Sequence, residues 1–77
     1  MVIQIFGLGC PTCRRMANDV RELVEHLKLD AVVEQVDDVE KIATLHLFVL
    51  PGLVIDGKVM MCGYSGKAKI ERLLLSL

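Results

Sequence analysis

Residues 2–27 restrict the folds open to this chain more than any other segment. Residues 2–6 are apolar except for Gln4, as expected of a buried central strand. From Cys13 to Leu27 the apolar residues recur at intervals of 3, 1, 3, 3, 1 and 3. This spacing places them on one stripe of an amphipathic helix. The segment therefore predicts a strand that leads, through a short glycine-containing turn, into a helix starting at Pro11.

A second strand and a short helix are predicted next. Residues 31–36 are rich in valine, which favours a strand. Asp37 precedes Glu40 by three residues and resembles a capping box with aspartate in the hydroxyl position. We therefore expect a short helix that ends at about Leu45.

The last third of the chain predicts a hairpin and a helix. Asp56-Gly57 separates residues 51–55 from residues 58–62, and this dipeptide favours a two-residue turn because both positions tolerate positive φ. Ser65 is a suitable cap for a final helix. The apolar residues within 70–77 have the 3, 1, 3 spacing of a helix stripe.

The predicted order, βαβαββα, defines an α/β fold. Two strands joined through a helix are expected to be parallel with a right-handed crossover. The hairpin adds an antiparallel pair, so we predict a four-stranded mixed sheet with helices on both faces, a three-layer sandwich. With 77 residues, of which 53% are hydrophobic, we expect a single domain that spans residues 1–77.

Composition argues against several functions. Nine basic and ten acidic residues give a net charge of −1, and the densest basic pair, Arg14-Arg15, is too small to follow a nucleic acid backbone. No run reaches the ~18–20 apolar residues of a membrane span, and no secretion signal is recognisable. Three cysteines do not suit a disulfide-stapled secreted scaffold. We therefore expect a cytoplasmic protein that binds neither nucleic acid nor membrane.

The sequence Cys10-Pro11-Thr12-Cys13 lies where the strand gives way to the helix. Cys10 falls at the N-cap and Pro11 at the first helical position. Unpaired amide groups and the helix dipole would then stabilise a Cys10 thiolate and lower its pKa below the ~8.5 of a free thiol. Cys13 falls on the apolar stripe and is expected to be buried. These placements predict that Cys10 attacks a disulfide and Cys13 resolves the mixed disulfide.

The chain resembles the thioredoxin superfamily, in particular its short thioredoxin- and glutaredoxin-like members, over essentially all 77 residues. The similar motifs are residues 9–13, the dipeptide Leu50-Pro51, residues 56–58 and Gly63. The resemblance implies a thioredoxin-like fold and a protein disulfide oxidoreductase that needs no cofactor beyond a Cys10–Cys13 disulfide. Its expected partners are disulfide-containing proteins and a thioredoxin-reductase-like or other dithiol electron donor.

The resemblance also implies how substrates bind. It implies that Pro51 is cis and packs beside the cysteine pair, and that the Leu50 backbone pairs with an extended substrate segment. Pro11 and Thr12, between the cysteines, are the other expected substrate contacts.

The chain departs from classical thioredoxins at three places. Gly9 stands where they carry a tryptophan, and Gln4 stands where they carry a buried carboxylate. The Pro-Thr pair between the cysteines also differs from theirs.

Cys62 is a third thiol, for which the sequence allows two interpretations. If the hairpin pairs Ile55 with Lys58, simple counting places Cys62 opposite Pro51, near the cysteine pair. We hypothesise an auxiliary thiol, which forms a mixed state with Cys10 or supplies a third soft-metal ligand. The simpler interpretation is a small buried core residue.

Other functions compete with the redox interpretation. Soft-metal carriers of the heavy-metal-associated type are similar in length and in their glycine- and cysteine-containing loop, but their order is βαββαβ. A thioredoxin fold that uses the same pair for metals or metalloids is a second alternative, although we predict no metal site. A purely structural role would leave the placement of the two cysteines unexplained.

Overall fold

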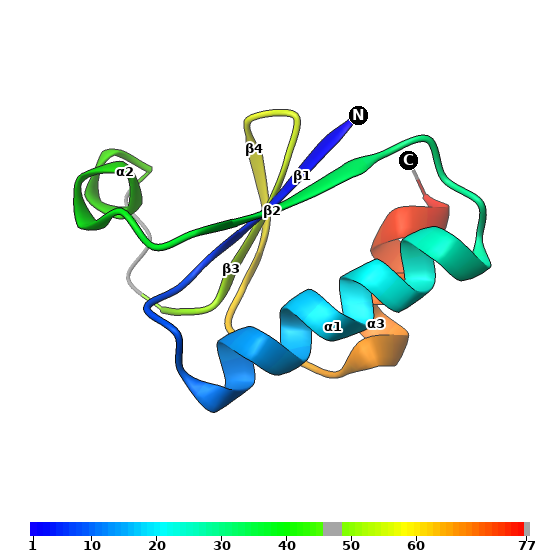
Figure 1. Ribbon diagram of the computed structural model, residues 1–77, viewed down its shortest axis with the longest axis horizontal. Helices are drawn as coiled ribbons and strands as arrows, with labels where there is room; N and C mark the ends of the chain where they lie inside the picture. Colours follow the sequence, from blue (N-terminus) through cyan, green and yellow to red (C-terminus); the bar gives the residue numbers. More distant parts are fainter. Residues whose placement is uncertain (46–48, 77) are drawn as a thin grey trace.

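The computed structural model describes residues 1–45 and 49–76, which form four strands and three helices (Figure 1). The elements, in chain order, are β1 (Val2–Phe6), α1 (Pro11–His26), β2 (Val32–Val36), α2 (Val39–Thr44), β3 (Gly52–Ile55), β4 (Lys58–Cys62) and α3 (Lys67–Leu75). The predicted order βαβαββα is confirmed. None of the helices in the described ranges is both long and apolar enough to cross a membrane.

The strands form a mixed sheet in the order β2-β1-β3-β4. β1 pairs in parallel with β2 and antiparallel with β3, and β3 pairs antiparallel with β4. β1 is therefore an interior strand, which agrees with its apolar sequence. The predicted parallel pair and hairpin are both present.

The helices cover both faces of the sheet. α1 and α3 lie side by side on one face, and α2 lies on the other (Figure 1). Successive side chains of a strand alternate between faces, so Ile3 and Ile5 of β1 pack toward α1 and α3, whereas Phe6 packs with Ile42 of α2. This is the predicted three-layer α/β sandwich.

The turn between β3 and β4 has the predicted geometry. Asp56 and Gly57 have φ values of 49° and 83°, as expected for a two-residue hairpin turn in which both positions are left-handed. The Val2 N–H donates to the Asp56 carboxylate at 2.8 Å. This hydrogen bond ties the turn to the start of β1.

The predicted hairpin register is wrong beyond the first two pairs. Val54 pairs with Val59, but Leu53 pairs with Met61, so the register shifts by one residue. Such a bulge places an extra residue in one strand, here in β4. Cys62 consequently lies opposite Gly52 rather than opposite Pro51.

Two helix starts also differ from prediction by one residue. Asp38, rather than Asp37, is the N-cap of α2, and its side chain accepts a hydrogen bond from the Glu40 N–H at 2.9 Å. α3 is preceded by Gly66, which has a φ of 98° and caps without a side chain, so the predicted Ser65 cap is wrong. Only glycine adopts such a backbone conformation readily.

Candidate active site

Cys10 and Cys13 form a disulfide at the first turn of α1, with their Cα atoms 5.1 Å apart. Cys10 is the N-cap, in an extended conformation with φ −67° and ψ 160°, and Pro11 begins the helix. The Arg14 N–H donates to the Cys10 carbonyl at 3.1 Å and closes the first helical turn. The predicted helix start, with Cys10 as the N-cap and Pro11 as the first helical residue, is therefore confirmed.

The sulfur of Cys10 lies among hydrogen-bond donors. The Cys13 N–H donates to Cys10 Sγ at 3.2 Å, and the Thr12 hydroxyl lies 3.4 Å from the same sulfur. The amide is one of the groups at a helix N-terminus that have no partner within the helix. Together with the positive end of the helix dipole, these donors favour a negatively charged sulfur once the disulfide is reduced.

The two cysteines differ in exposure. Cys13 is 6% exposed and belongs to the buried face of α1, whereas Cys10 is only partly buried. Solvent and a second protein can therefore reach the sulfur of Cys10 more readily than that of Cys13.

Pro51 lies near Cys13, because a Cβ atom on Gly7 would overlap Cys13 Sγ and lie 3.9 Å from Pro51 Cβ. The Leu50–Pro51 bond is cis, as the resemblance implied, and Pro51 is fully buried. Its carbonyl accepts a hydrogen bond from the Gly63 N–H at 2.7 Å, next to the end of β4. Leu50 is half-buried, while Pro11 and Thr12 are exposed.

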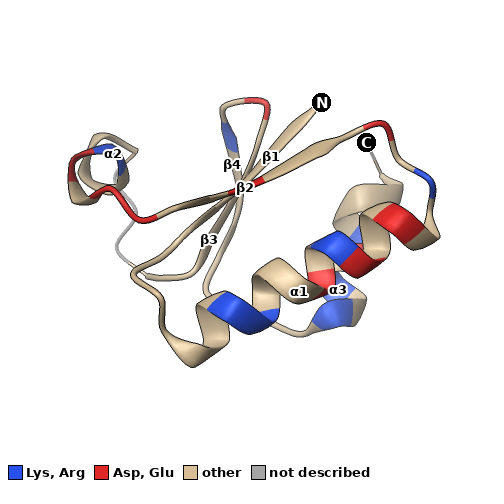
Figure 2. Ribbon diagram, viewed as in Figure 1, with Lys and Arg blue, Asp and Glu red and all other residues tan. Residues whose placement is uncertain are grey.

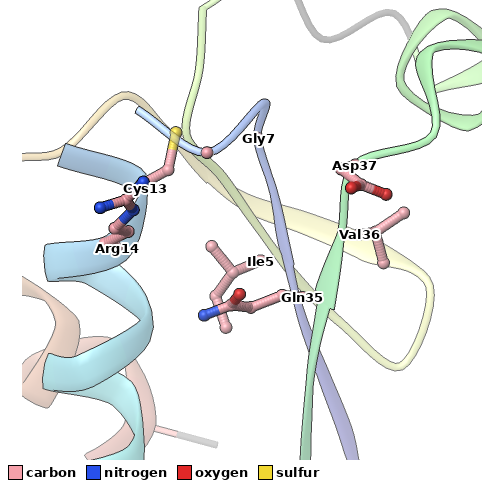
Figure 3. Close-up of a pocket in the computed structure, with 8 residues that line it drawn as sticks. Ile5, Gly7, Cys13, Arg14, Gln35, Val36 and Asp37 are labelled. Atoms are coloured by element: carbon pink, nitrogen blue, oxygen red, sulfur yellow. The ribbon is translucent and has the colours of Figure 1, made fainter. Parts of the chain in front are cut away.

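A cavity of about 180 Å³ opens next to Cys13, between α1 and the ends of β1 and β2 (Figure 3). Cys13 and Arg14 of α1 line one side, and Asp37, just after β2, lies across from them. Figure 2 shows basic residues near the start of α1 and acidic residues between β2 and α2. The cavity beside Cys13 thus has a basic residue, Arg14, on one side and an acidic residue, Asp37, on the other.

Cys62 is a free, exposed thiol, so its interpretation as a buried core residue is wrong. Its neighbour Met61 packs in the core on the α1 side, so alternation along the strand places Cys62 on the α2 side. The sheet thus separates it from α1. Within residues 1–45 and 49–76, no group of three or more histidine, cysteine or acidic side chains is arranged to hold a metal ion.

Gly7 is a site residue that the sequence analysis missed. A Cβ atom on it would overlap Cys13 Sγ and would lie 3.9 Å from Pro51 Cβ, so Gly7 lies close to both residues. A glycine after a strand usually indicates a turn. The sequence therefore gave no reason to expect that this one makes room for a sulfur.

Comparisons with known proteins agree with this geometry. A family model described as a thioredoxin domain matches residues 1–75. The chain is 36% identical to a thioredoxin of Methanothermobacter thermautotrophicus over 75 residues, which are 96% of this chain and 97% of that protein. It is 41% identical to a thioredoxin of Methanocaldococcus jannaschii over 63 residues, 82% of this chain and 72% of that protein.

A solved structure is similar in fold. The crystal structure of Deadhead, a germline-specific thioredoxin of Drosophila melanogaster, matches with a TM-score of 0.69 and 17% identity. The match covers 99% of this chain and 79% of that one.

Proposed function

The chain belongs to the thioredoxin domain family and is a thiol–disulfide oxidoreductase, and we propose that Cys10 is its attacking cysteine and Cys13 its resolving cysteine. One observation carries this assignment: the partly exposed Cys10 sulfur accepts the N–H of the buried Cys13 at the start of a helix. A sulfur held in this way is the better thiolate at neutral pH.

The proposed reaction transfers two electrons to a substrate disulfide. The Cys10 thiolate attacks one substrate sulfur, forms a mixed disulfide and releases the other sulfur as a thiolate, which takes a proton from solvent. The Cys13 thiol then loses its proton and attacks the Cys10 sulfur. The Cys10–Cys13 disulfide closes, and the second substrate thiolate leaves and is protonated.

We propose disulfide-containing proteins as substrates and a thioredoxin-reductase-like or other dithiol protein as the electron donor. The Leu50 backbone, next to the cis proline, would pair with an extended substrate segment, and Pro11 and Thr12 would contact it beside the attacked sulfur. Their exposure at the start of α1 supports this role. We further propose that residues 1–77 act as one domain, in the cytoplasm, and need no cofactor beyond the Cys10–Cys13 disulfide.

Reduction of insulin with dithiothreitol tests the roles of the two cysteines. Cys10→Ser is expected to abolish turnover without an adduct, because no thiolate remains to attack. Cys13→Ser, the matched change three residues away, is expected to stop after the first step. When it is reduced and freed of dithiothreitol before insulin is added, it should accumulate a mixed disulfide at Cys10. Mass spectrometry identifies that adduct. Full turnover by Cys10→Ser, or an adduct at Cys13 instead, would contradict the assignment.

Cys62 is proposed as an auxiliary thiol, and its exposure supports this role. Its placement on the α2 side of the sheet, away from α1, argues against a direct bond to Cys10. Thiol labelling of the native reduced protein at graded pH, followed by peptide mapping, measures its reactivity. Rapid labelling of Cys62 would support the proposal. An inert Cys62 would remove it.

The metal-carrier alternative receives no support from the comparisons, because the matched family and both archaeal relatives are thioredoxins. We therefore do not retain it as a second candidate function.

A further inference from the structure

The side chain of Cys13 lies so close to the backbone of Gly7 that no side chain fits at position 7. A Cβ atom on Gly7 would overlap Cys13 Sγ and would lie 2.9 Å from Cys13 Cβ. Carbon atoms in favourable contact lie about 3.5–4.0 Å apart. Any side chain at position 7 therefore requires Cys13 or β1 to move.

The backbone of Gly7 does not itself require glycine. Positive φ values occur at Gly9, Gly57, Gly63 and Gly66, but Gly7 is not among these. Its N–H donates to the Val36 carbonyl at 2.9 Å and extends the pairing of β1 with β2. Gly7 thus lacks the left-handed backbone conformation that favours glycine, and the space that it leaves for Cys13 is its distinctive property.

The sulfur of Cys13 has different freedom in the two redox states. In the disulfide, its bond to Cys10 fixes its position against Gly7. In the dithiol, the side chain can rotate to another staggered position, and the adjoining cavity of about 180 Å³ offers room for it. A side chain at position 7 would therefore destabilise the disulfide more than the dithiol.

We propose that Gly7 is a positioning residue for Cys13, and that the lack of a side chain at position 7 sets the balance between disulfide and dithiol. The proposal rests on the proposed function, because that function makes the balance matter. It concerns the formation of the Cys10–Cys13 bond and does not depend on which cysteine attacks.

Equilibration of Gly7→Ala with glutathione redox buffers tests the proposal. We expect the equilibrium to move toward the dithiol by about tenfold or more relative to the wild type, which corresponds to about 30 mV. Urea unfolding of both redox forms should show a larger loss of stability for the oxidised form. A lowered stability that is equal in both forms, with an unchanged glutathione equilibrium, would overturn the proposal.

Gly57→Ala is a matched control. Gly57 has a φ of 83°, and a Cβ atom there meets no atom within 4 Å. Alanine at this hairpin turn strains the backbone far from the disulfide. It should therefore lower the stability of both redox forms equally and leave the glutathione equilibrium at the wild-type value.

A second comparison, made in the Cys13→Ala variant, tests the proposal if Gly7→Ala alone does not fold. Cys13→Ala removes the sulfur that the new methyl group overlaps, so Gly7→Ala should cost clearly less stability in Cys13→Ala than in the oxidised wild type. An equal cost in both backgrounds, or a Gly7→Ala/Cys13→Ala double variant that does not fold, would show that the sulfur is not what Gly7 accommodates. The insulin assay of Cys10→Ser separately tests the proposed function.

Discussion

At the scale of single residues, Cys10 and Cys13 have the same side chain but different surroundings. Their separation by three residues places both sulfurs on one side of the first helical turn, so the disulfide can close. Cys10 lies at the N-cap, among donors, whereas Cys13 is 6% exposed against the sheet. Their proposed division of roles follows from these positions.

Thr12 should tune the reactivity of Cys10. Its hydroxyl lies 3.4 Å from Cys10 Sγ and can donate a hydrogen bond to the thiolate of the reduced protein. Loss of one such bond in Thr12→Val should lower the alkylation rate of Cys10 by roughly threefold to tenfold at a pH below the pKa of Cys10.

Thr44→Val is the control for this prediction. The Thr44 hydroxyl donates to the Glu40 carbonyl at 2.8 Å in α2, away from the disulfide. The same substitution there should leave the alkylation rate unchanged. Equal rates for Thr12→Val and the wild type would show that the hydroxyl does not stabilise the thiolate.

The site residues that could be predicted from the sequence depend on local structure or on the family resemblance. Cys10 and Pro11 form a helix start that is recognisable within a few residues. The cis bond before Pro51 was implied by the resemblance alone. The role of Gly7 and the register of Cys62 could not be predicted, because one depends on packing between β1 and α1 and the other on a bulge in β4.

At the scale of elements, α1 and α3 are held together by a shared core and by polar contacts. Ile70 and Leu74 of α3 pack into the cluster that contains Met16 and Val20 of α1. At the edge, the Tyr64 hydroxyl donates to the Asp19 carboxylate. The buried stripe does most to fix α3, because exposed polar contacts contribute little.

Shortening a buried side chain of α3 should therefore lower the stability of the protein considerably. Ile70 is completely buried, so Ile70→Ala should lower the free energy of unfolding by about 2–5 kcal/mol. Leu75, in the same helix, is 62% exposed, and Leu75→Ala should change it by no more than about 0.5 kcal/mol. Urea unfolding measures both. Similar values for the two variants would contradict the observed packing of α3.

The polar contacts between α1 and the α3 region predict a pH dependence. The hydrogen bond to Asp19 and partial desolvation raise the pKa of Tyr64 above its ordinary value of 10.0. Its contribution to stability is therefore complete below pH 10 and is lost as the pH rises through the raised pKa. Tyr64→Phe should show a smaller alkaline loss of stability than the wild type. An unchanged alkaline profile would count against this contact.

The loss of stability at low pH depends on Glu22. The hydrogen bond and charge of Lys67, whose Nζ lies 2.6 Å from Glu22 Oε2, lower the pKa of Glu22 below its ordinary value of 4.5. This contribution is present above pH 4.5 and is lost as the pH falls through the lowered pKa. Glu22→Gln should therefore reduce the acid loss of stability. It should also remove the share of the alkaline loss that comes from Lys67, because the hydrogen bond to Glu22 raises the pKa of Lys67.

Element types were predicted well because each has a strong local pattern. The stripe of α1 and the Asp56-Gly57 turn are examples. The starts of α2 and α3 differ from the prediction by one residue. For α2 the reason is that Asp37 and Asp38 are both suitable caps. For α3 the reason is that the conformation of Gly66 depends on the path of the chain into the helix.

At the scale of the whole molecule, the interior strands β1 and β3 are more fully buried than helix α2. β3 is buried along its whole length, whereas α2 has six residues and Ile42 is its buried residue. Segments with few buried side chains open most easily. We therefore expect the amides of β1 and β3 to exchange slowest and those of α2 to exchange faster than those of α1.

Hydrogen exchange followed by mass spectrometry or NMR measures this order. Protection of the α2 amides equal to that of β1 would contradict it. The overall topology could be predicted because a helix between parallel strands restricts the crossover and the hairpin fixes the next pair. Relative stability across the molecule could not be predicted, because it depends on burial.

The most direct test of the account is a pH titration of Cys10 in the reduced protein. The alkylation rate of Cys10, measured by peptide mass spectrometry, should follow a single ionisation with a pKa well below the ~8.5 of a free thiol, while Cys13 remains slow to react. A Cys10 ionisation at or above 8.5, or faster alkylation of Cys13, would contradict the assignment of Cys10 as the attacking thiolate.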